Sequence, residues 1–214
     1  MLMVSAERQG IDLYPYGVGK VAAGWGDIKV KQLLPMLRGF QANSYTHVLY
    51  TDGRDSLFAR GQAAILNEYI LLGLPPCLMS AEVNCYPLQA LGDDFPDPGT
   101  PWRYPCAGQF MGEIPWILEH WQMLQRDYEP TLENNDQAWI SQAIVDGKMD
   151  GLELDTGCRI FQSMNGTELK WRGHAWNPLT NSSPCVLHFN GGYVDPEKGR
   201  DEVMQPSWEK IKAY

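Results

Sequence analysis

Short apolar runs alternate with amphipathic stretches along the chain, a pattern typical of α/β proteins. The run HVLYTD at residues 47–52 predicts a buried strand, residues 61–73 predict a helix, and CLMSAE at residues 77–82 predicts the next strand. Strand, helix and strand in this order predict a βαβ crossover, with Asp52 at the carboxyl end of a parallel strand. In open α/β sheets, ligands bind at that edge.

The first forty residues carry helical signals. Residues 5–10 indicate the end of a helix that stops at Gly10, and residues 11–16 predict a short strand. From residue 28 to residue 40, apolar side chains recur at helical spacing. We expect Pro35 to kink or shorten this helix, because proline lacks the N–H group that a helix interior uses.

The rest of the chain predicts a long loop, then helices, then strands. Residues 83–105 contain five prolines and predict an irregular segment. Helical patterns cover residues 114–127, 136–147 and 205–214. Asn134 or Asn135 is suited to cap the second of these helices, and Ser207 the third. The late strand candidates are residues 151–155, 159–164 and 184–192.

Composition narrows the class of protein. The 214 residues show no internal repeat and no low-complexity linker, which predicts a single domain over residues 1–214. The net charge of −9 comes without a cluster of Lys and Arg, so nucleic acid is a disfavoured partner. The five cysteines form no close CxxC pair, which argues against a zinc knuckle and predicts reduced, mostly buried thiols. The apolar start is too short for a signal peptide or a membrane span, so the sequence predicts a soluble, cytoplasmic protein.

Two aspartates after the strand at residues 47–52 are the first candidates for chemistry. Taken singly, Asp52 or Asp55 is most often a turn residue or a helix cap. Together they suit a hard divalent cation, which takes oxygen ligands and fills its remaining positions with substrate phosphates. His188 follows another apolar strand and precedes a glycine turn, so it is the natural third ligand, and the alternative is an ordinary core histidine. An imidazole ligand favours Mn²⁺, so the ion we expect is Mn²⁺, with Mg²⁺ as the second choice.

Asp136 stands in NNDQ at the start of a predicted helix. Capping or compensation of the helix dipole is the structural interpretation. The functional one is that the carboxylate receives the proton of an acceptor hydroxyl or stabilises positive charge at an anomeric carbon. No GxSxG, HExxH or GxGxxG motif occurs, so hydrolase, zinc-protease and dinucleotide-binding functions lack support.

Several short blocks follow one another in a fixed order. They are GWGDIKVKQLL, VLYTDGRDSLFA, SAEVNCYP, AGQFMG, NNDQ, LELDTGCRIFQSMNG and LHFNGG, and they extend from Gly24 to Gly192. In this order they resemble the glycosyltransferase domain of the procollagen lysyl hydroxylases. The resemblance implies a GT-A fold, a Rossmann-like mixed α/β sheet flanked by helices, which binds a UDP-sugar through Mn²⁺. In that fold the first nucleotide-binding strand should precede a segment such as VSAERQGI, which only Met1 to Met3 precede here, so the resemblance implies that this strand is missing or that the fold is trimmed.

The resemblance assigns roles to individual residues. Asp52, Asp55 and His188 fall on its metal-ligand positions. Asp136, with Asn135 beside it, falls at the sugar-transfer site. The positions that it implies for donor contact are Lys29, Thr51, Arg54, Glu82, Tyr86, Asn190 and Gly191.

Some of these positions differ from the family pattern. Arg54 stands where the family has an aromatic residue that stacks on uracil, and a guanidinium can also stack on a base. Tyr86 replaces a tryptophan beside the sugar. Cys106 and Ala107 replace an Asn-Ser pair that faces the sugar, and Asn135 stands within what is a run of acidic residues in relatives.

The function we expect is transfer of a hexose, glucose or galactose, from a UDP-sugar to a hydroxyl acceptor on a protein, a glycan or a small molecule. The alternative is a catalytically weak or inactive GT-A-like module that binds nucleotide or glycan. A glycosyltransferase for modified nucleic acid is disfavoured by the acidic charge. A structural protein whose acids only cap helices would gain no thermal stability from a metal ion.

Overall fold

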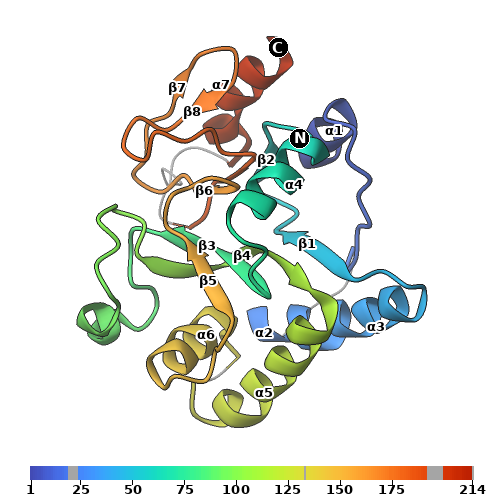
Figure 1. Ribbon diagram of the computed structural model, residues 1–214, viewed down its shortest axis with the longest axis vertical. Helices are drawn as coiled ribbons and strands as arrows, with labels where there is room; N and C mark the ends of the chain where they lie inside the picture. Colours follow the sequence, from blue (N-terminus) through green and yellow to red (C-terminus); the bar gives the residue numbers. More distant parts are fainter. Residues whose placement is uncertain (19–23, 133, 192–199, 214) are drawn as a thin grey trace.

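The computed structural model describes residues 1–18, 24–132, 134–191 and 200–213. Two residues of the predicted elements, Gly192 and Tyr214, lie outside these ranges. The described chain forms a mixed α/β fold with three sheets, whose strand orders are β1-β4-β3-β5, β2-β9-β6 and β7-β8 (Figure 1). The mixed sheet flanked by helices confirms the predicted fold class.

The largest sheet contains both antiparallel and parallel pairs. Its strands, in spatial order, are β1 His47–Thr51, β4 Tyr104–Glu113, β3 Cys77–Glu82 and β5 Leu152–Asp155. Strand β4 runs antiparallel to β1 and to β3, and β3 runs parallel to β5. Strands β1, β3 and β5 therefore point the same way, which brings Asp52 after β1 and Glu82 at the end of β3 to one edge of the sheet.

The predicted crossover between β1 and β3 is correct in direction and wrong in adjacency. Strand β4 lies between them, so β1 is an edge strand in which only Tyr50 is buried. The sequence did not indicate β4, because Pro105, Gly108 and Gly112 resemble turn residues there. Gly112 is needed for packing, since a Cβ atom at this position would lie 2.3 Å from the carbonyl oxygen of Pro76.

A second sheet continues from the end of β1. It contains β2 Ser56–Phe58, β9 Val186–His188 and β6 Phe161–Ser163. Strand β9 pairs antiparallel with β2, which places Ser56 opposite His188, and parallel with β6. Strands β7 Lys170–Trp171 and β8 Ala175–Trp176 form a small hairpin. The predicted β5, β6 and β9 are confirmed, whereas β2, β7 and β8 were not predicted.

Helices cover the sheets from two sides (Figure 1). They are α1 Leu2–Arg8, α2 Trp25–Asp27, the π-helical segment η1 Ile28–Leu33, α3 Leu34–Ala42, α4 Gln62–Leu71, the 3₁₀ segment η2 Gln89–Asp94, α5 Ile114–Leu132, α6 Asp136–Val145 and α7 Arg200–Ala213. Among the described helices, none combines the length and apolar character needed to cross a bilayer. Helix α1 is the first described element, and no described strand precedes it.

Two predictions in or beside helices need correction, and the one at Pro35 is borne out. Residues 11–16 form no strand after Gly10, which ends α1 with φ +64°. At Pro35 the helix is interrupted as expected: the π-helical segment η1 precedes the shorter α-helix α3, and Pro35 lies in the first turn of α3, where a missing N–H is tolerated. Ser207 does not cap the last helix but lies inside α7, which begins at Arg200. Asn135 caps α6 as predicted, since its Oδ1 accepts a hydrogen bond from the Ala138 N–H at 3.1 Å.

The hydrophobic core lies on both faces of the large sheet. One cluster joins the sheet to α3, α5 and α6, with Phe110, Ile117 and Trp139 fully buried. The other joins it to α1, α4 and the second sheet through Phe58 and Phe161. All five cysteines are free thiols and four of them are buried, as predicted. These clusters hold the two sheets at a fixed position, and the polar residues gather where the sheets meet.

Asp155 at the end of β5 generates the first prediction. Its side chain, 2% exposed, accepts hydrogen bonds from the backbone N–H groups of Arg159, Ile160 and Phe161 at 2.8–2.9 Å. Asp155→Ala leaves these buried donors without an acceptor, so we expect it to lower the free energy of unfolding by about 3 kcal/mol or more. Urea unfolding followed by circular dichroism measures this. The matched control Asp150→Ala removes an exposed carboxylate and should change the free energy of unfolding by about 0.5 kcal/mol or less. Equal effects of the two substitutions would contradict the role of Asp155 as the acceptor of these hydrogen bonds.

Candidate functional site

The turn between β1 and β2 is clamped by both sheets. The N–H of Asp52 donates to the carbonyl of Gly108 in β4 at 2.8 Å, and the N–H of Phe189 after β9 donates to the carbonyl of Asp55 at 2.7 Å. Inside the turn, the hydroxyl of Thr51 donates to Oγ of Ser56 at 2.7 Å. Because the turn bridges the two sheets, the backbone positions of both aspartates are fixed.

This turn brings Asp52 and Asp55 to His188 at the end of β9. Nε2 of His188 lies 3.8 Å from Oδ2 of Asp52 and 3.5 Å from Oδ1 of Asp55. One ligand atom from each of the three residues lies within 4.8 Å of the others. Bonds of about 2.0–2.6 Å to one ion place neighbouring ligand atoms about 3–4 Å apart and opposite ones about 4–5 Å apart. The predicted metal ligands therefore converge, with a donor set that fits a divalent cation.

Gly108 provides the space in which two of these side chains meet. A Cβ atom on Gly108 would lie 2.2 Å from Cε1 of His188 and 2.9 Å from Oδ2 of Asp52. The register of β4 against β3 shifts at this point, because Met79 pairs with Phe110 and Ser80 pairs with Cys106. The bulge in β4 thus presents a glycine where any other residue would displace the imidazole.

A buried lysine joins the metal-ligand cluster to α6. Nζ of Lys29, which is 2% exposed, donates to the Tyr50 hydroxyl at 2.9 Å and lies 3.2 Å from Oδ2 of Asp136 and 3.7 Å from Oδ1 of Asp52. Tyr50 in turn donates to Oδ1 of Asp52 at 2.5 Å. This leaves Oδ2 of Asp52 directed toward His188. Asp136 also accepts a hydrogen bond from the N–H of Gln137 at 3.0 Å, as expected at a helix start.

A second network surrounds Glu82. Its carboxylate accepts hydrogen bonds from Nε2 of Gln137 at 2.6 Å and from Nδ2 of Asn190 at 3.1 Å. Gln137 also donates to the carbonyl of Tyr86 at 2.9 Å, and its Oε1 accepts from the N–H of Ala107 at 3.2 Å. Glu82 therefore ties the end of β3 to the start of α6 and to the segment after His188.

Burial and neighbouring charges shift several pKa values in the site. Burial alone would lower the pKa of Lys29, but the carboxylates of Asp136 and Asp52 outweigh it and raise the pKa, so Lys29 stays charged. Burial likewise opposes a charged His188, but Cys106 and the carboxylates of Asp55 and Asp52 raise its pKa well above the ordinary value.

The remaining acids and thiols respond to burial directly. Burial raises the pKa of Glu82 to about 7, although the hydrogen bonds from Gln137 and Asn190 act in the opposite direction. Burial also raises the pKa of Tyr50 and of Cys106, so both keep their protons near neutral pH.

The other predicted site residues fall into two groups. Asn190 lies within the Glu82 network and also accepts from the Ser163 hydroxyl at 2.7 Å, whereas Asn135 makes the capping contact of α6. Arg54, Tyr86 and Gly191 are exposed around the cluster. The structure thus brings Asp52, Asp55 and His188 together with Lys29 and Asp136, and Glu82 together with Asn190.

Sequence reasoning missed four residues that shape the site: Tyr50, Gly108, Gln137 and, as a partner of His188, Cys106. In the sequence, Tyr50 has the pattern of an ordinary strand residue, and Gly108 has that of a turn residue. Gln137 follows Asp136 within NNDQ, which is the one signal that could have directed attention to it. Nothing in the local sequence of Cys106 indicates its contact with a histidine from another sheet.

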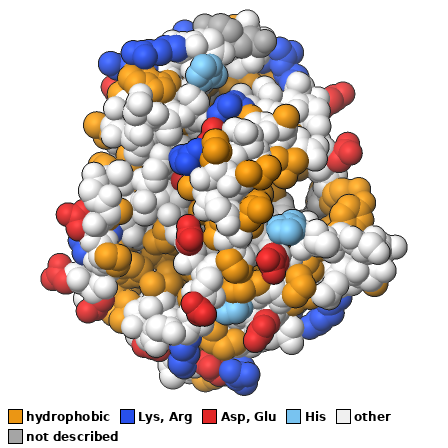
Figure 2. All heavy atoms as spheres, in the orientation of Figure 1, with side chains coloured by type: hydrophobic (Ala, Val, Ile, Leu, Met, Phe, Trp, Pro, Cys, Tyr) orange, Lys and Arg blue, Asp and Glu red, His pale blue; other side chains and the backbone are white. Residues whose placement is uncertain are grey.

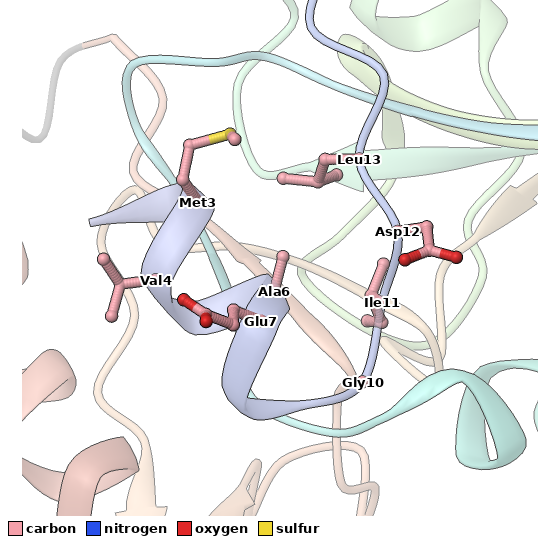
Figure 3. Close-up of a pocket in the computed structure, with 8 residues that line it drawn as sticks. All are labelled: Met3, Val4, Ala6, Glu7, Gly10, Ile11, Asp12 and Leu13. Atoms are coloured by element: carbon pink, nitrogen blue, oxygen red, sulfur yellow. The ribbon is translucent and has the colours of Figure 1, made fainter.

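A hollow lies on the surface away from these residues. It measures about 350 Å³ and lies between α1 and the segment that follows it, lined by Met3, Val4, Ala6, Glu7, Gly10, Ile11, Asp12 and Leu13 (Figure 3). None of the predicted site residues lines it. On the face shown in Figure 2, Lys and Arg are scattered among Asp and Glu, with no broad basic area for a nucleic acid.

Comparison with known proteins gives a consistent set of relatives. A family model described as "PLOD GT domain" matches residues 4–194. The multifunctional procollagen lysine hydroxylase and glycosyltransferase LH3 of Homo sapiens is 27% identical over 179 residues, covering 78% of this chain and 23% of the relative. A procollagen-lysine,2-oxoglutarate 5-dioxygenase of Drosophila melanogaster is 26% identical over 207 residues, covering 87% of this chain and 28% of the relative. The uncharacterized protein R699 of Acanthamoeba polyphaga mimivirus is 28% identical over 173 residues, covering 79% of this chain and 36% of the relative. The chain therefore spans well under half the length of these relatives.

The close approach at Gly108 predicts a large effect of one methyl group. Gly108→Ala places a Cβ against the buried His188 ring, which cannot move without repacking, so we expect a loss of about 1–3 kcal/mol in the free energy of unfolding. Gly39→Ala in α3 is the matched control, because a Cβ there meets nothing within 4 Å. The control should stabilise by about 0.5–1 kcal/mol, as alanine does in an exposed helix. Thermal unfolding of both variants measures this, and a Gly108→Ala protein as stable as wild type would contradict the geometry.

The raised pKa of Glu82 predicts a pH-dependent stability. Because the folded state holds this proton more tightly than the unfolded chain, the contribution of Glu82 is greatest below pH 4.5 and is lost as the pH rises from 4.5 to about 7. Glu82→Gln cannot titrate, so the wild-type stability should fall relative to this variant by about 1–3 kcal/mol across the window. Urea unfolding of both proteins at several pH values measures the difference, in which other titrating groups cancel. A difference that stays constant with pH would contradict the prediction.

Proposed function

The chain belongs to the PLOD GT domain family, a family that includes glycosyltransferases, and we propose that it transfers a hexose, glucose or galactose, from a UDP-sugar to a hydroxyl acceptor. The proposal treats residues 1–214 as a single glycosyltransferase-like domain. The observation that carries it is the convergence of Asp52, Asp55 and His188 from two sheets around one point. Helix caps and turn residues have no reason to meet in this way.

The proposed cofactor is Mn²⁺, with Mg²⁺ as the second choice, held by Asp52, Asp55 and His188. The donor set of two carboxylates and one imidazole fits such an ion, and the space over Gly108 lets the ligands approach one another. When bound, the cation supplies positive charge that offsets the charge developing on the departing diphosphate. Tyr50 holds Oδ1 of Asp52, which leaves Oδ2 for the ion.

Lys29 and Asp136 act on the other side of the cluster. In the proposed reaction, the bond between the anomeric carbon and the diphosphate oxygen breaks, and a bond to the acceptor oxygen forms. Asp136, held 3.2 Å from the Lys29 ammonium, acts as the base for the acceptor proton or stabilises charge at the anomeric carbon, with Asn135 beside it. Lys29 forms an ion pair with Asp136 and adds positive charge near the proposed diphosphate position.

The donor is proposed to lie across the edge where β1, β3 and β9 end. Thr51 and Arg54 flank Asp52 in the chain, Asn190 and Gly191 follow closely after His188, and the exposed guanidinium of Arg54 can stack on uracil. Glu82, together with the exposed Tyr86, would contact the sugar. The acceptor is a hydroxyl group of a protein, a glycan or a small molecule.

A second candidate is a GT-A-like module that binds the nucleotide sugar without transferring the sugar. Two residues at the proposed transfer site favour this second candidate, because both already have partners. Asn135 caps α6, and Asp136 forms an ion pair with Lys29. Incubation with Mn²⁺ and either UDP-glucose or UDP-galactose separates the two candidates. Slow release of UDP into water indicates a working transfer site, whereas binding without any release supports the module.

Asp52→Asn tests the proposed metal role directly. The variant keeps the size of the side chain but lacks the charge, so we expect at least a tenfold loss of Mn²⁺-dependent UDP binding, about 1.4 kcal/mol or more, together with loss of UDP release. Titration calorimetry with UDP in the presence of Mn²⁺ measures the affinity, and circular dichroism checks folding. Asp93→Asn in η2 is the matched control, because Asp93 is exposed and outside the cluster. Unchanged Mn²⁺-dependent UDP binding in a folded Asp52→Asn protein would refute the metal assignment.

A further inference from the structure

The two ring nitrogens of His188 face different partners. Nε2 lies toward Asp52 and Asp55, at 3.8 and 3.5 Å. Nδ1 lies 3.5 Å from Sγ of Cys106 in β4, within hydrogen-bond distance for a sulfur atom. A histidine that binds a metal ion through one nitrogen usually donates its other N–H to a fixed acceptor, which sets the ring orientation. In this site the acceptor in that position is a thiol.

Cys106 lies beside the bulge in β4, and its side chain points at the imidazole of His188. It pairs with Ser80 just beyond the register shift between Met79 and Ser80, and it is 1% exposed. Gly108, two residues further on, leaves the space that the same ring fills. The bulge therefore does two things for His188: one residue makes room for the ring and the other contacts its Nδ1 edge.

The surroundings of Cys106 differ from those of the other buried cysteines. Cys77, Cys158 and Cys185 each belong to an apolar cluster of the core. Cys106 belongs to none of the apolar clusters found among the described residues, and its sulfur faces the imidazole instead. A role in packing alone explains the three others better than it explains Cys106.

We propose that Cys106 is a positioning residue for the metal centre: its sulfur accepts the Nδ1–H of His188 and so holds Nε2 toward Asp52 and Asp55. The proposal rests on the proposed function, in that it assumes a cation bound between these residues. It also changes the role expected for position 106. The family resemblance implies a residue that faces the sugar, whereas the side chain here faces a metal ligand.

Three variants of Cys106 separate hydrogen bonding from packing. Cys106→Ala removes the acceptor and leaves a space, Cys106→Val removes the acceptor but fills the space, and Cys106→Ser keeps an acceptor. Cys185→Ala is the matched control, because Cys185 is a fully buried cysteine in an apolar cluster that does not include His188. The dissociation constant of Mn²⁺ is measured from the electron paramagnetic resonance signal of free Mn²⁺, and melting temperatures of the metal-free proteins report packing.

We expect Cys106→Ala and Cys106→Val to weaken Mn²⁺ binding by about 10–100-fold, the usual effect of losing such a partner of a metal-bound histidine. Cys106→Ser should restore most of the affinity. Cys185→Ala should lower the melting temperature without changing Mn²⁺ binding. If Cys106→Ala fails to fold, the comparison of Cys106→Val with Cys106→Ser carries the test.

Two outcomes would overturn the role of Cys106. One is a folded alanine or valine variant that binds Mn²⁺ as tightly as wild type, and the other is a folded serine variant that binds no better than these. Both leave the proposed function in place, because wild type still binds the ion. A wild-type protein that binds no Mn²⁺, with or without UDP, would instead refute the proposed function, and the role of Cys106 with it.

Discussion

The site depends on the close approach of two sheets at Gly108. The turn after β1 connects the large sheet to the second sheet, and β9 pairs with the strand that follows this turn. His188 and Asp52 can meet only because the bulge of β4 presents a residue without a side chain between them. The approach of His188 to the two aspartates and the contact of its Nδ1 with Sγ of Cys106 both depend on this one steric constraint.

Burial then determines how the acidic residues are held. Charged groups are costly to bury unless they are paired or hydrogen-bonded. The ammonium group of Lys29 offsets this cost for Asp136 by direct pairing. For Asp52 it does so partly through the Tyr50 hydroxyl, which bonds to both groups. The result is a site whose carboxylates are fixed in place before any ligand arrives, which suits the proposed binding and transfer of a charged donor.

Local patterns in the sequence predicted the helices and strands that form mainly through interactions between residues close in the chain. The alternation of runs gave the α/β class, β3 with its bounds, helix α4, and α6 with Asn135 as its cap. The spacing of Asp52 and Asp55 indicated a metal site, and His188 was recognised from the apolar strand before it. Convergence of all three needs the pairing of β2 with β9, which is a contact between distant parts of the chain.

The features that could not be predicted are also non-local. Strand β4 carries Pro105 and Gly108, which locally indicate a turn, and only the neighbouring β1 and β3 make this segment the centre of the sheet. The same holds for Cys106, since a thiol has no sequence pattern that would mark a histidine contact. The π-helical form of the segment before Pro35 is a local adjustment that propensity alone does not predict.

Crystallography can show whether one cation binds between Asp52, Asp55 and His188, as proposed. Crystals grown with Mn²⁺ and UDP, measured on both sides of the manganese absorption edge, locate the ion by its anomalous signal. We expect a single strong peak about 2.0–2.6 Å from a carboxylate oxygen of each aspartate and from Nε2 of His188, next to the diphosphate. A manganese peak elsewhere, or bound UDP with no peak between these three residues, would contradict it.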